Sequence, residues 1–373
     1  MNPEQVHPFR LFERLDWLTG APLMSVIEPY RRRIFEELLH SFDDAGVRRY
    51  NFALIGRAKK NWKSADLCLS ALYMLLVWRS PLGNDCVICS NDHDQARDTL
   101  NILKKLIARN PILEREVDVT ANAVRRRDGK GTLATVASRE TRGLHGGSRL
   151  ATFYDEVGGF KDSDLFTALA PDPHRAHESL TYVTGYRGVH EGPGCPMHDY
   201  FERCRAGTLP SDYFSWYDGE YSTDPDFMRD GLTPEERANP SLPSFALGYL
   251  EEAYQRLSAA GYRQVHLNLP SQPSNAAFNV EAVERCMITG VRELPREHGR
   301  QYHAWFDGSA GHSRIRFWRS PTTTRPPARR SWRGSRGRPA SRRSRRRRRS
   351  GNSPASSTST GWPASTATIG GAP

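Results

Sequence analysis

The sequence predicts an α/β fold with a mainly parallel β-sheet that is covered by helices. Between residues 49 and 184, short apolar runs alternate with longer amphipathic stretches, the pattern of repeated strand–helix–strand units. Parallel strands need crossover connections, which helices supply over the faces of the sheet. The expected strands are residues 51–55, 85–89, 132–137, 150–154 and 180–184. The expected helices are residues 30–40, 65–77, 92–109 and 163–169.

Beyond residue 184 the periodic pattern weakens, and Gly and Pro become more frequent. A helix is expected over residues 247–259, because its apolar residues recur on one face, and Gly261 is the expected stop. Strands are expected over residues 264–269 and 301–307. The chain is long enough for two domains of ordinary size.

The basic charge of the chain is concentrated at its C-terminal end. The formal net charge is +11, yet 16 Arg and no acidic residue lie between Arg314 and Pro373. The rest of the chain carries 37 basic and 42 acidic residues, a net charge of −5, so any DNA-binding surface there must be a local patch. After Gly311 the composition is Arg, Ser, Pro, Thr, Ala and Gly, which cannot build a packed core. The tail is either a natural nucleic-acid-binding arm or the product of a frameshift in a GC-rich gene.

The sequence contains no membrane or secretion signal. No stretch approaches the roughly 18 consecutive apolar residues of a membrane-spanning helix, and charged residues interrupt the N-terminal region. We therefore expect an intracellular, soluble protein. Cys86 and Cys89 could form a zinc or redox pair, but no second Cys or His pair follows at finger spacing. The alternative, which we favour, is that both cysteines are buried in a strand.

A phosphate-binding loop is predicted between the strand at 51–55 and the helix at 65–77. The connecting segment is basic and ends in Lys63 and Ser64. Loop N–H groups and a helix N-terminus together bind phosphate oxygens. Lys63 is expected to place a cation near the β- and γ-phosphates of ATP, and Ser64 to offer its hydroxyl to Mg²⁺.

This loop departs from the usual glycine-rich pattern. Arg57 and Trp62 stand where that pattern has glycine, and Gly56 lies one position too early. The alternative interpretation is an ordinary basic turn on the surface. The expected nucleotide-binding residues of the loop are Arg57, Asn61, Trp62, Lys63 and Ser64.

Two adjacent carboxylates, Asp155 and Glu156, follow the apolar strand at 150–154. Burial of unpaired charge is costly, so a metal ion or a water relay is the natural compensation. We expect Asp155 to hold Mg²⁺ and Glu156 to activate the attacking water as general base. Thr184, at the end of the next strand, is expected to sense the γ-phosphate and couple its loss to the rest of the protein. An acidic pair on the surface and an ordinary strand end are the alternatives.

Together these residues resemble the large-terminase family of tailed bacteriophages. Basic, glycine-poor loops like residues 57–64 are typical of that family. The segment 137–146, before the acidic pair, is similar to the family's loop at that place, and segments 238–240 and 268–270 resemble its hinge. The resemblance covers about residues 25–311.

The resemblance adds further site residues. Tyr30 falls where the family contacts adenine, although Arg31 stands where the family usually has Gln. Arg142, or else Arg139, precedes the acidic strand and is expected to reach a phosphate as an arginine finger, unless both are ordinary loop arginines. Asp307 is similar to the first metal-binding Asp of the family's RNase H-like nuclease domain.

The resemblance also implies a domain order. The expected segments are an N-terminal lead-in (1–30), a P-loop ATPase core (31–190), an ATPase subdomain with a hinge (191–299), the start of the nuclease domain (300–312) and a disordered tail (313–373). Two-metal hydrolysis needs several converging carboxylates, and no Asp or Glu follows Asp307. We therefore expect nuclease activity to be lost.

The function that the resemblance implies is an ATP-driven motor subunit that packages double-stranded DNA into procapsids. Its cofactors would be ATP and Mg²⁺. Its partners would be DNA, a small terminase subunit, the portal protein and further copies of itself, in the host cytoplasm and without a membrane. One alternative is another DNA-dependent ATPase, but no helicase motif follows residue 184. Another is a decayed prophage remnant that binds DNA only through its arginine-rich tail.

Overall fold

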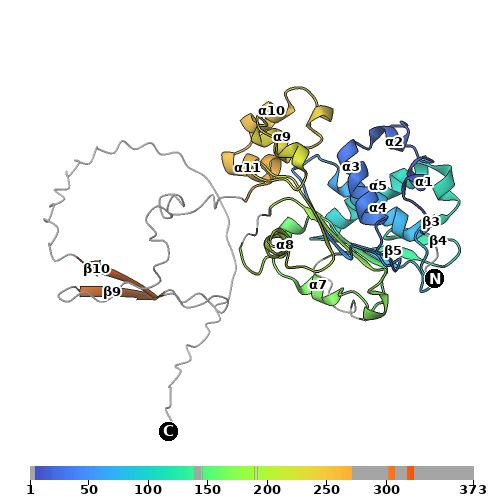
Figure 1. Cartoon of the computed structure of the whole chain (residues 1–373), viewed down its shortest axis with the longest axis horizontal. Coiled ribbons are helices and arrows are strands. Elements are labelled where there is room, and N and C mark those ends of the chain that lie inside the picture. The colour runs from blue at the N-terminus through green and yellow to red at the C-terminus, as the bar shows by residue number, and fades with distance from the viewer. Residues whose placement is uncertain are drawn as a thin grey trace, which may run out of the picture. The chain divides into compact units, whose positions relative to one another are not determined.

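The computed structural model describes residues 5–137, 144, 146–188, 190, 192–270, 301–306 and 317–322. The chain divides into two compact units, Met1–Ile288 and Thr289–Pro373, whose elements are labelled in Figure 1. The first unit contains the sheet, the helices and the candidate site. In the described part of the chain, no helix is long and apolar enough to cross a membrane.

The first unit is built on an eight-stranded sheet with the order β3-β4-β5-β2-β6-β7-β1-β8. Its strands are β1 (Phe52–Gly56), β2 (Cys86–Ser90), β3 (Val117–Val119), β4 (Ala123–Arg126), β5 (Thr132–Ala137), β6 (Ala151–Tyr154), β7 (Leu180–Gly185) and β8 (Asp212–Trp216). The six strands from β5 to β8 in this order pair in parallel, and β4 and β3 extend the edge by antiparallel pairing. The predicted α/β fold with a mainly parallel sheet is confirmed.

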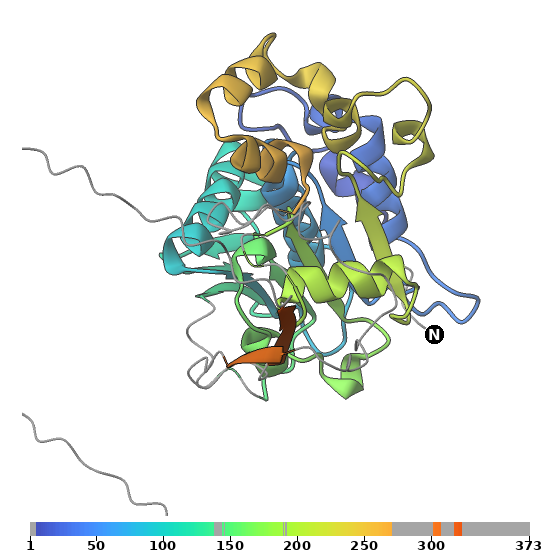
Figure 2. The same ribbon diagram turned by 90° about the vertical axis from the view of Figure 1, so that its left-hand side faces the viewer.

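Helices cover both faces of this sheet, as Figures 1 and 2 show. They are α1 (Phe9–Phe12), α2 (Leu23–Val26), α3 (Pro29–Leu39), α4 (Lys63–Leu76), α5 (His93–Arg109), α6 (Pro111–Glu114), α7 (Asp164–Ala168), α8 (Pro196–Arg205), α9 (Pro234–Ala238), α10 (Tyr249–Arg256) and α11 (Ala259–Leu267). Short 3₁₀ turns lie at Val157–Gly159, Pro173–Arg175, Pro225–Phe227 and Leu242–Ser244.

Alternating residues of each central strand face two separate hydrophobic clusters. In β1, Ile55 packs in the cluster that holds the apolar residues of α3, α4 and α5, whereas Leu54 packs in the cluster that holds those of α7 and α8. Strand β2 follows the same rule. Its Cys86 and Cys89 are both buried but belong to different clusters, so the two thiols face opposite sides of the sheet. The interpretation of these cysteines as buried strand residues is confirmed.

The strand predicted for residues 264–269 is wrong, because this segment belongs to α11. Ser258 caps the helix by accepting the backbone N–H of Gly261, so this glycine lies in the first turn of α11 and does not end the helix before it. The buried residues Tyr262 and His266 are four positions apart and lie on one helical face. The apolar alternation at 265, 267 and 269 resembled a strand but is not what sets the burial.

Two strands of the second unit are described, β9 (Gln301–Phe306) and β10 (Phe317–Thr322). They pair antiparallel, with Phe317 opposite Phe306. Strand β9 agrees with the strand expected at 301–307. Strand β10 corrects the expectation that the tail is unstructured from residue 313, since aromatic residues favour strands and β9 supplies the hydrogen-bonding partner. The rest of the predicted tail lies outside the described residues.

Candidate nucleotide-binding site

The candidate site lies where three parallel strands end at the same edge of the sheet. Strands β6, β7 and β1 are neighbours in that order and run in one direction, so their carboxyl ends meet. The basic loop follows β1, and the acidic pair follows β6. Ligands of open α/β sheets bind at such carboxyl ends.

Lys63 begins α4 and lies buried against the acidic pair. Its Nζ donates a hydrogen bond to the backbone oxygen of Ala58 at 3.1 Å and lies 4.0 Å from the Glu156 carboxylate. It also lies 5.2 Å from the centre of the Tyr186 ring. Burial lowers the pKa of Lys63, and the negative charge of Glu156 counteracts that shift. The ammonium group therefore depends on nearby anionic groups for its charge.

Asp155 is a buried carboxylate surrounded by hydrogen-bond donors. Thr99 Oγ1 donates to Asp155 Oδ2 at 2.8 Å, and the backbone N–H of Glu156 donates to Oδ1 at 3.1 Å. The Ser64 hydroxyl also hydrogen-bonds this carboxylate. Burial raises the pKa of Asp155, whereas these donors and Lys63 act to lower it. The structure thus brings Ser64 and Asp155, the two predicted Mg²⁺ ligands of this unit, into contact.

Glu156 is the more accessible of the two acids. Its side chain is 34% exposed, and its backbone is left-handed at φ 52°. Burial raises the pKa of Glu156, the positive charge of Lys63 lowers it, and the neighbouring Asp155 raises it further. A carboxyl group whose pKa is raised is a stronger proton acceptor once it is ionised.

Thr184 links the middle strand of the site to the strand before the loop. Its side chain is fully buried, and its Oγ1 donates to the backbone oxygen of Ile55 at 2.8 Å. Gly56 follows Ile55, and a Cβ atom there would lie 2.1 Å from the Trp216 ring. This tight packing between β7, β1 and β8 fixes the point at which the loop leaves the sheet.

Trp62 takes the backbone conformation that glycine usually provides at this position. Its φ is 61°, in the left-handed region. The indole Nε1 donates to Glu28 at 3.1 Å, and the ring contacts Trp17 and lies 4.7 Å below the guanidinium of Arg31. These contacts explain how a bulky residue is accommodated where the usual loop has none.

Arg57 and Tyr30 are both buried, and both have partners within the protein. Arg57 donates to Asp66 at 2.8 Å and to the Tyr30 hydroxyl at 3.1 Å. The Tyr30 hydroxyl lies 2.7 Å from Ser241 Oγ, and Arg31 binds the other oxygen of Asp66 at 2.8 Å. Contacts of Arg57 and Tyr30 with a nucleotide remain predictions.

Several neighbours of the site were not predicted from the sequence. Thr99, Tyr186 and Asp66 contact the predicted residues but lie outside the two short motifs. Asp66 carried a signal, because it is a lone acid in the otherwise apolar α4. Of the predicted residues, Arg142 and Asp307 lie outside the described part of the chain, as does Arg139.

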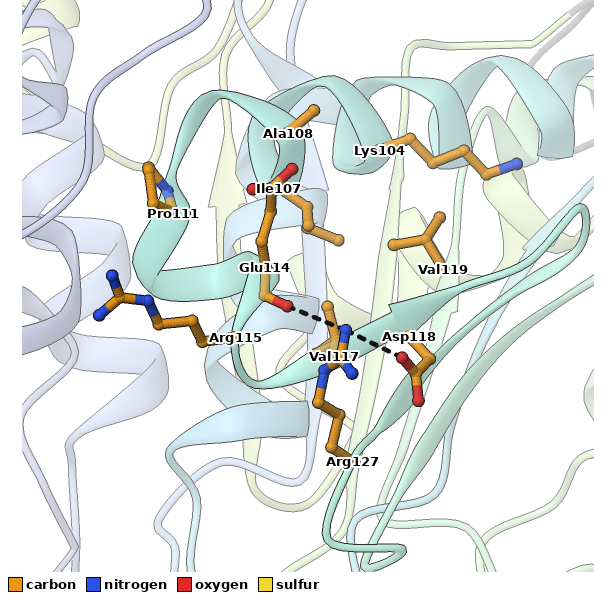
Figure 3. Close-up of a pocket in the computed structure, with 10 residues that line it drawn as sticks. All are labelled: Lys104, Ile107, Ala108, Pro111, Glu114, Arg115, Val117, Asp118, Val119 and Arg127. Carbon is orange, nitrogen blue, oxygen red and sulfur yellow. Dashed lines mark hydrogen bonds and ion pairs between the residues drawn. The ribbon is translucent and has the colours of Figure 1, made fainter.

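A hollow shown in Figure 3 lies elsewhere in the first unit. It is lined from α5, α6, β3 and β4, and within it Arg127 pairs with Asp118 at 3.0 Å. Strand β3 is at the edge of the sheet, with β4, β5 and β2 between it and β6. The hollow is therefore separate from the acidic pair. In the described part of the chain, no three His, Cys, Asp or Glu side chains form a metal-binding cluster.

The fold and the site edge are those of a P-loop type α/β domain, and comparison with solved structures narrows the fold further. The HK97 bacteriophage large terminase matches with a TM-score of 0.59 and 18% identity, over 81% of this chain and 61% of that one. The large terminase of a thermophilic bacteriophage, in complex with ADP, matches at 0.47 and 10%, over 80% and 65%. The Thermus phage P74-26 large terminase ATPase domain matches at 0.43 and 12%, over 63% and 96%.

The fold assignment rests on the HK97 structure, whose TM-score is the highest of these three. This chain has the fold of a phage large terminase, as the sequence resemblance predicted. It spans 61% of the length of the HK97 protein. No protein-family model matches the sequence, and a search of curated proteins found no match.

Proposed function

We propose that this chain is the ATPase part of a motor that moves double-stranded DNA. The observation that carries the proposal is the convergence of a buried lysine, a hydroxyl and two carboxylates at one edge of the sheet. Lys63 lies 4.0 Å from Glu156, and Ser64 hydrogen-bonds Asp155. These are the groups that phosphoryl transfer from ATP requires.

In this proposal the loop binds the phosphates of ATP. The N-terminus of α4 and the loop N–H groups attract anions, and Lys63 supplies the positive charge next to them. Bound phosphates would offset the burial that lowers the pKa of Lys63. The aromatic ring of Tyr186 limits where the ammonium group can move.

The residues at Asp155 fit a magnesium ion. Mg²⁺ prefers oxygen ligands and is usually held by one or two carboxylates together with substrate phosphates and waters. Ser64 and Asp155 offer a hydroxyl and a carboxylate that already touch, and Thr99 orients the carboxylate from behind. When bound, the ion would neutralise charge on the phosphates.

Glu156 is assigned the role of general base. Its carboxylate is partly exposed, so a water molecule can reach it, and its raised pKa suits proton abstraction. Thr184 is assigned a coupling role, because its hydroxyl joins the strand between the two motifs to the strand that leads into the loop. Loss of the γ-phosphate at the loop would alter this contact.

The motor function extends this proposal through the terminase fold. The likeness to HK97 large terminase supports DNA packaging, with a small terminase subunit, a portal protein and further copies of this chain as partners in the host cytoplasm. Adenine contact by Tyr30, an arginine finger at Arg142 and an Asp307 that has lost its nuclease partners complete the proposal. In all of these the resemblance in sequence and fold is the support.

Translocation provides the test of the motor function. On linear duplex DNA carrying a bound third strand, we expect the chain to displace that strand only when MgATP is present, because a translocating motor removes obstacles in its path. The measurement is the fraction of labelled third strand released over time, with ADP in place of ATP as the control. Release of one strand of an ordinary duplex would instead indicate a helicase, and ATP-independent binding that weakens steeply with salt would indicate a DNA-binding remnant.

A further inference from the structure

Two residues of the nucleotide-binding loop hold a backbone conformation that side chains disfavour. Lys60 has φ 73° and Trp62 has φ 61°, both in the left-handed region. Residues with a Cβ atom rarely adopt this region, and they keep it only where the surrounding structure holds them. A loop rich in glycine needs no such support. This loop must therefore be held in shape from outside.

Asn61, between these two residues, makes the contacts that can hold the loop. Its side chain is fully buried. Its Nδ2 donates to the backbone oxygens of Ala58 and Lys59, both at 3.2 Å, and to Asn239 Oδ1 at 2.9 Å. Its Oδ1 accepts the backbone N–H of Ser241 at 3.0 Å. The amide thus ties the loop both to itself and to a segment far along the chain.

Asn239 is itself held in one orientation. Its Nδ2 donates to the backbone oxygens of Glu235 at 2.8 Å and His266 at 2.9 Å. With the amino group used in this way, Oδ1 faces Asn61. Asn239 ends α9, and His266 belongs to α11, so this one side chain joins two helices to the loop.

Backbone contacts run parallel to this side-chain pair. The N–H of Lys59 donates to the oxygen of Val265 at 2.7 Å, and that of Ala58 donates to the oxygen of Ala238 at 3.4 Å. The segment that contains α9 and α11 therefore borders the loop along several consecutive residues. Of these contacts, the pair Asn61 and Asn239 is the one that depends on side-chain identity.

We propose that Asn61 and Asn239 are positioning residues that brace the glycine-poor loop in its phosphate-binding conformation. The inference rests on the proposed function, because it assigns the loop to phosphates. The brace acts through the loop backbone: it keeps Lys60 and Trp62 left-handed, so that the loop N–H groups and Lys63 stay aimed at one place. The same bonds make the shape of the loop dependent on the position of α9 and α11.

The test is the affinity for MgADP, measured by isothermal titration calorimetry on the full chain. Asn239→Ala is expected to weaken binding about tenfold, the equivalent of about 1.4 kcal/mol. That is the size expected for the loss of one buried hydrogen bond that orders the site. Asn61→Ala, which removes the other side of the pair, should weaken binding to a similar extent and serves if the first variant fails to fold.

A rescue experiment separates bracing from a general structural defect. Adding Lys60→Gly to Asn239→Ala should recover most of the lost affinity, since glycine adopts the left-handed conformation without support. Lys60→Ala in the same background removes the same charge but keeps the Cβ atom, so it should recover none. Equal effects of the glycine and alanine variants would overturn the proposal.

Hydrogen–deuterium exchange without nucleotide keeps the brace testable apart from the proposed function. Asn239→Ala should increase exchange in the peptide covering residues 56–63 and leave the C-terminal half of α4 unchanged. If the unmodified chain binds no MgADP, the proposed function fails, and the exchange result alone decides on the brace. Unchanged exchange in residues 56–63 overturns the brace whether or not nucleotide binds.

Discussion

Replacement of Glu156 by Gln is expected to lower the rate of ATP hydrolysis by about 10²–10⁴-fold, the usual contribution of general base catalysis. The amide keeps the size of the side chain but cannot accept a proton from water. Nucleotide binding should persist, because Lys63, the loop and Ser64 are unchanged. The measurement is phosphate release at saturating MgATP, together with MgATP affinity by titration.

The unmodified chain should also show an acid limb in its pH–rate profile. Because burial raises the pKa of Glu156 above its ordinary value of 4.5, the ionised base is lost on acidification at a higher pH than for an exposed Glu. Glu116→Gln, at an exposed acid before β3, is the matched control and should leave hydrolysis unchanged. Undiminished hydrolysis in Glu156→Gln would contradict the assignment of the base.

Replacement of Asp66 by Ala is expected to lower the free energy of unfolding by about 3–5 kcal/mol, the usual effect of breaking a buried ion pair. Asp66 is buried in α4, and its two oxygens bind Arg31 and Arg57, which are also buried. Burial alone would lower the pKa of Arg57, but its neighbours, Asp66 among them, raise it above its ordinary value. Without Asp66, two guanidinium groups remain buried without that partner.

Chemical denaturation followed by circular dichroism measures this loss. The control is Glu252→Ala, which removes an exposed partner of Arg256 whose side chain is 77% exposed. Such surface pairs contribute about 0.3–0.5 kcal/mol, so the control should be nearly neutral. If Asp66→Ala were as mild as the control, the buried triad would not be a determinant of stability.

Local sequence pattern was sufficient to predict the framework of the site. The long buried strands β1, β2, β6 and β7 and the helices after them have strong periodicity, so their positions were predicted to within two residues. Parallel pairing then places the loop after β1 near the acids after β6. That is why Lys63 and Glu156, far apart in the sequence, could be expected to meet.

Features that depend on distant contacts could not be predicted in this way. Strands β3, β4 and β8 are short, and β3 and β4 lie at an edge with exposed residues, so their apolar pattern is weak. Arg57 was expected at the nucleotide because it lies in the loop, yet its side chain turns to Asp66 and Tyr30. The contact of Asn61 with Asn239 joins residues 178 positions apart, and no local pattern reports it.

Phosphate release from MgATP by the unmodified chain and by Lys63→Ala tests most directly that this site hydrolyses ATP. Lys105→Ala, at an exposed lysine of α5, is the matched control. The account predicts steady hydrolysis by the unmodified chain and by the control, and a loss of at least about 10²-fold in Lys63→Ala, as expected when a charge that stabilises the transition state is removed. Hydrolysis that survives in Lys63→Ala, or that is absent from the unmodified chain with its fold intact, would contradict it.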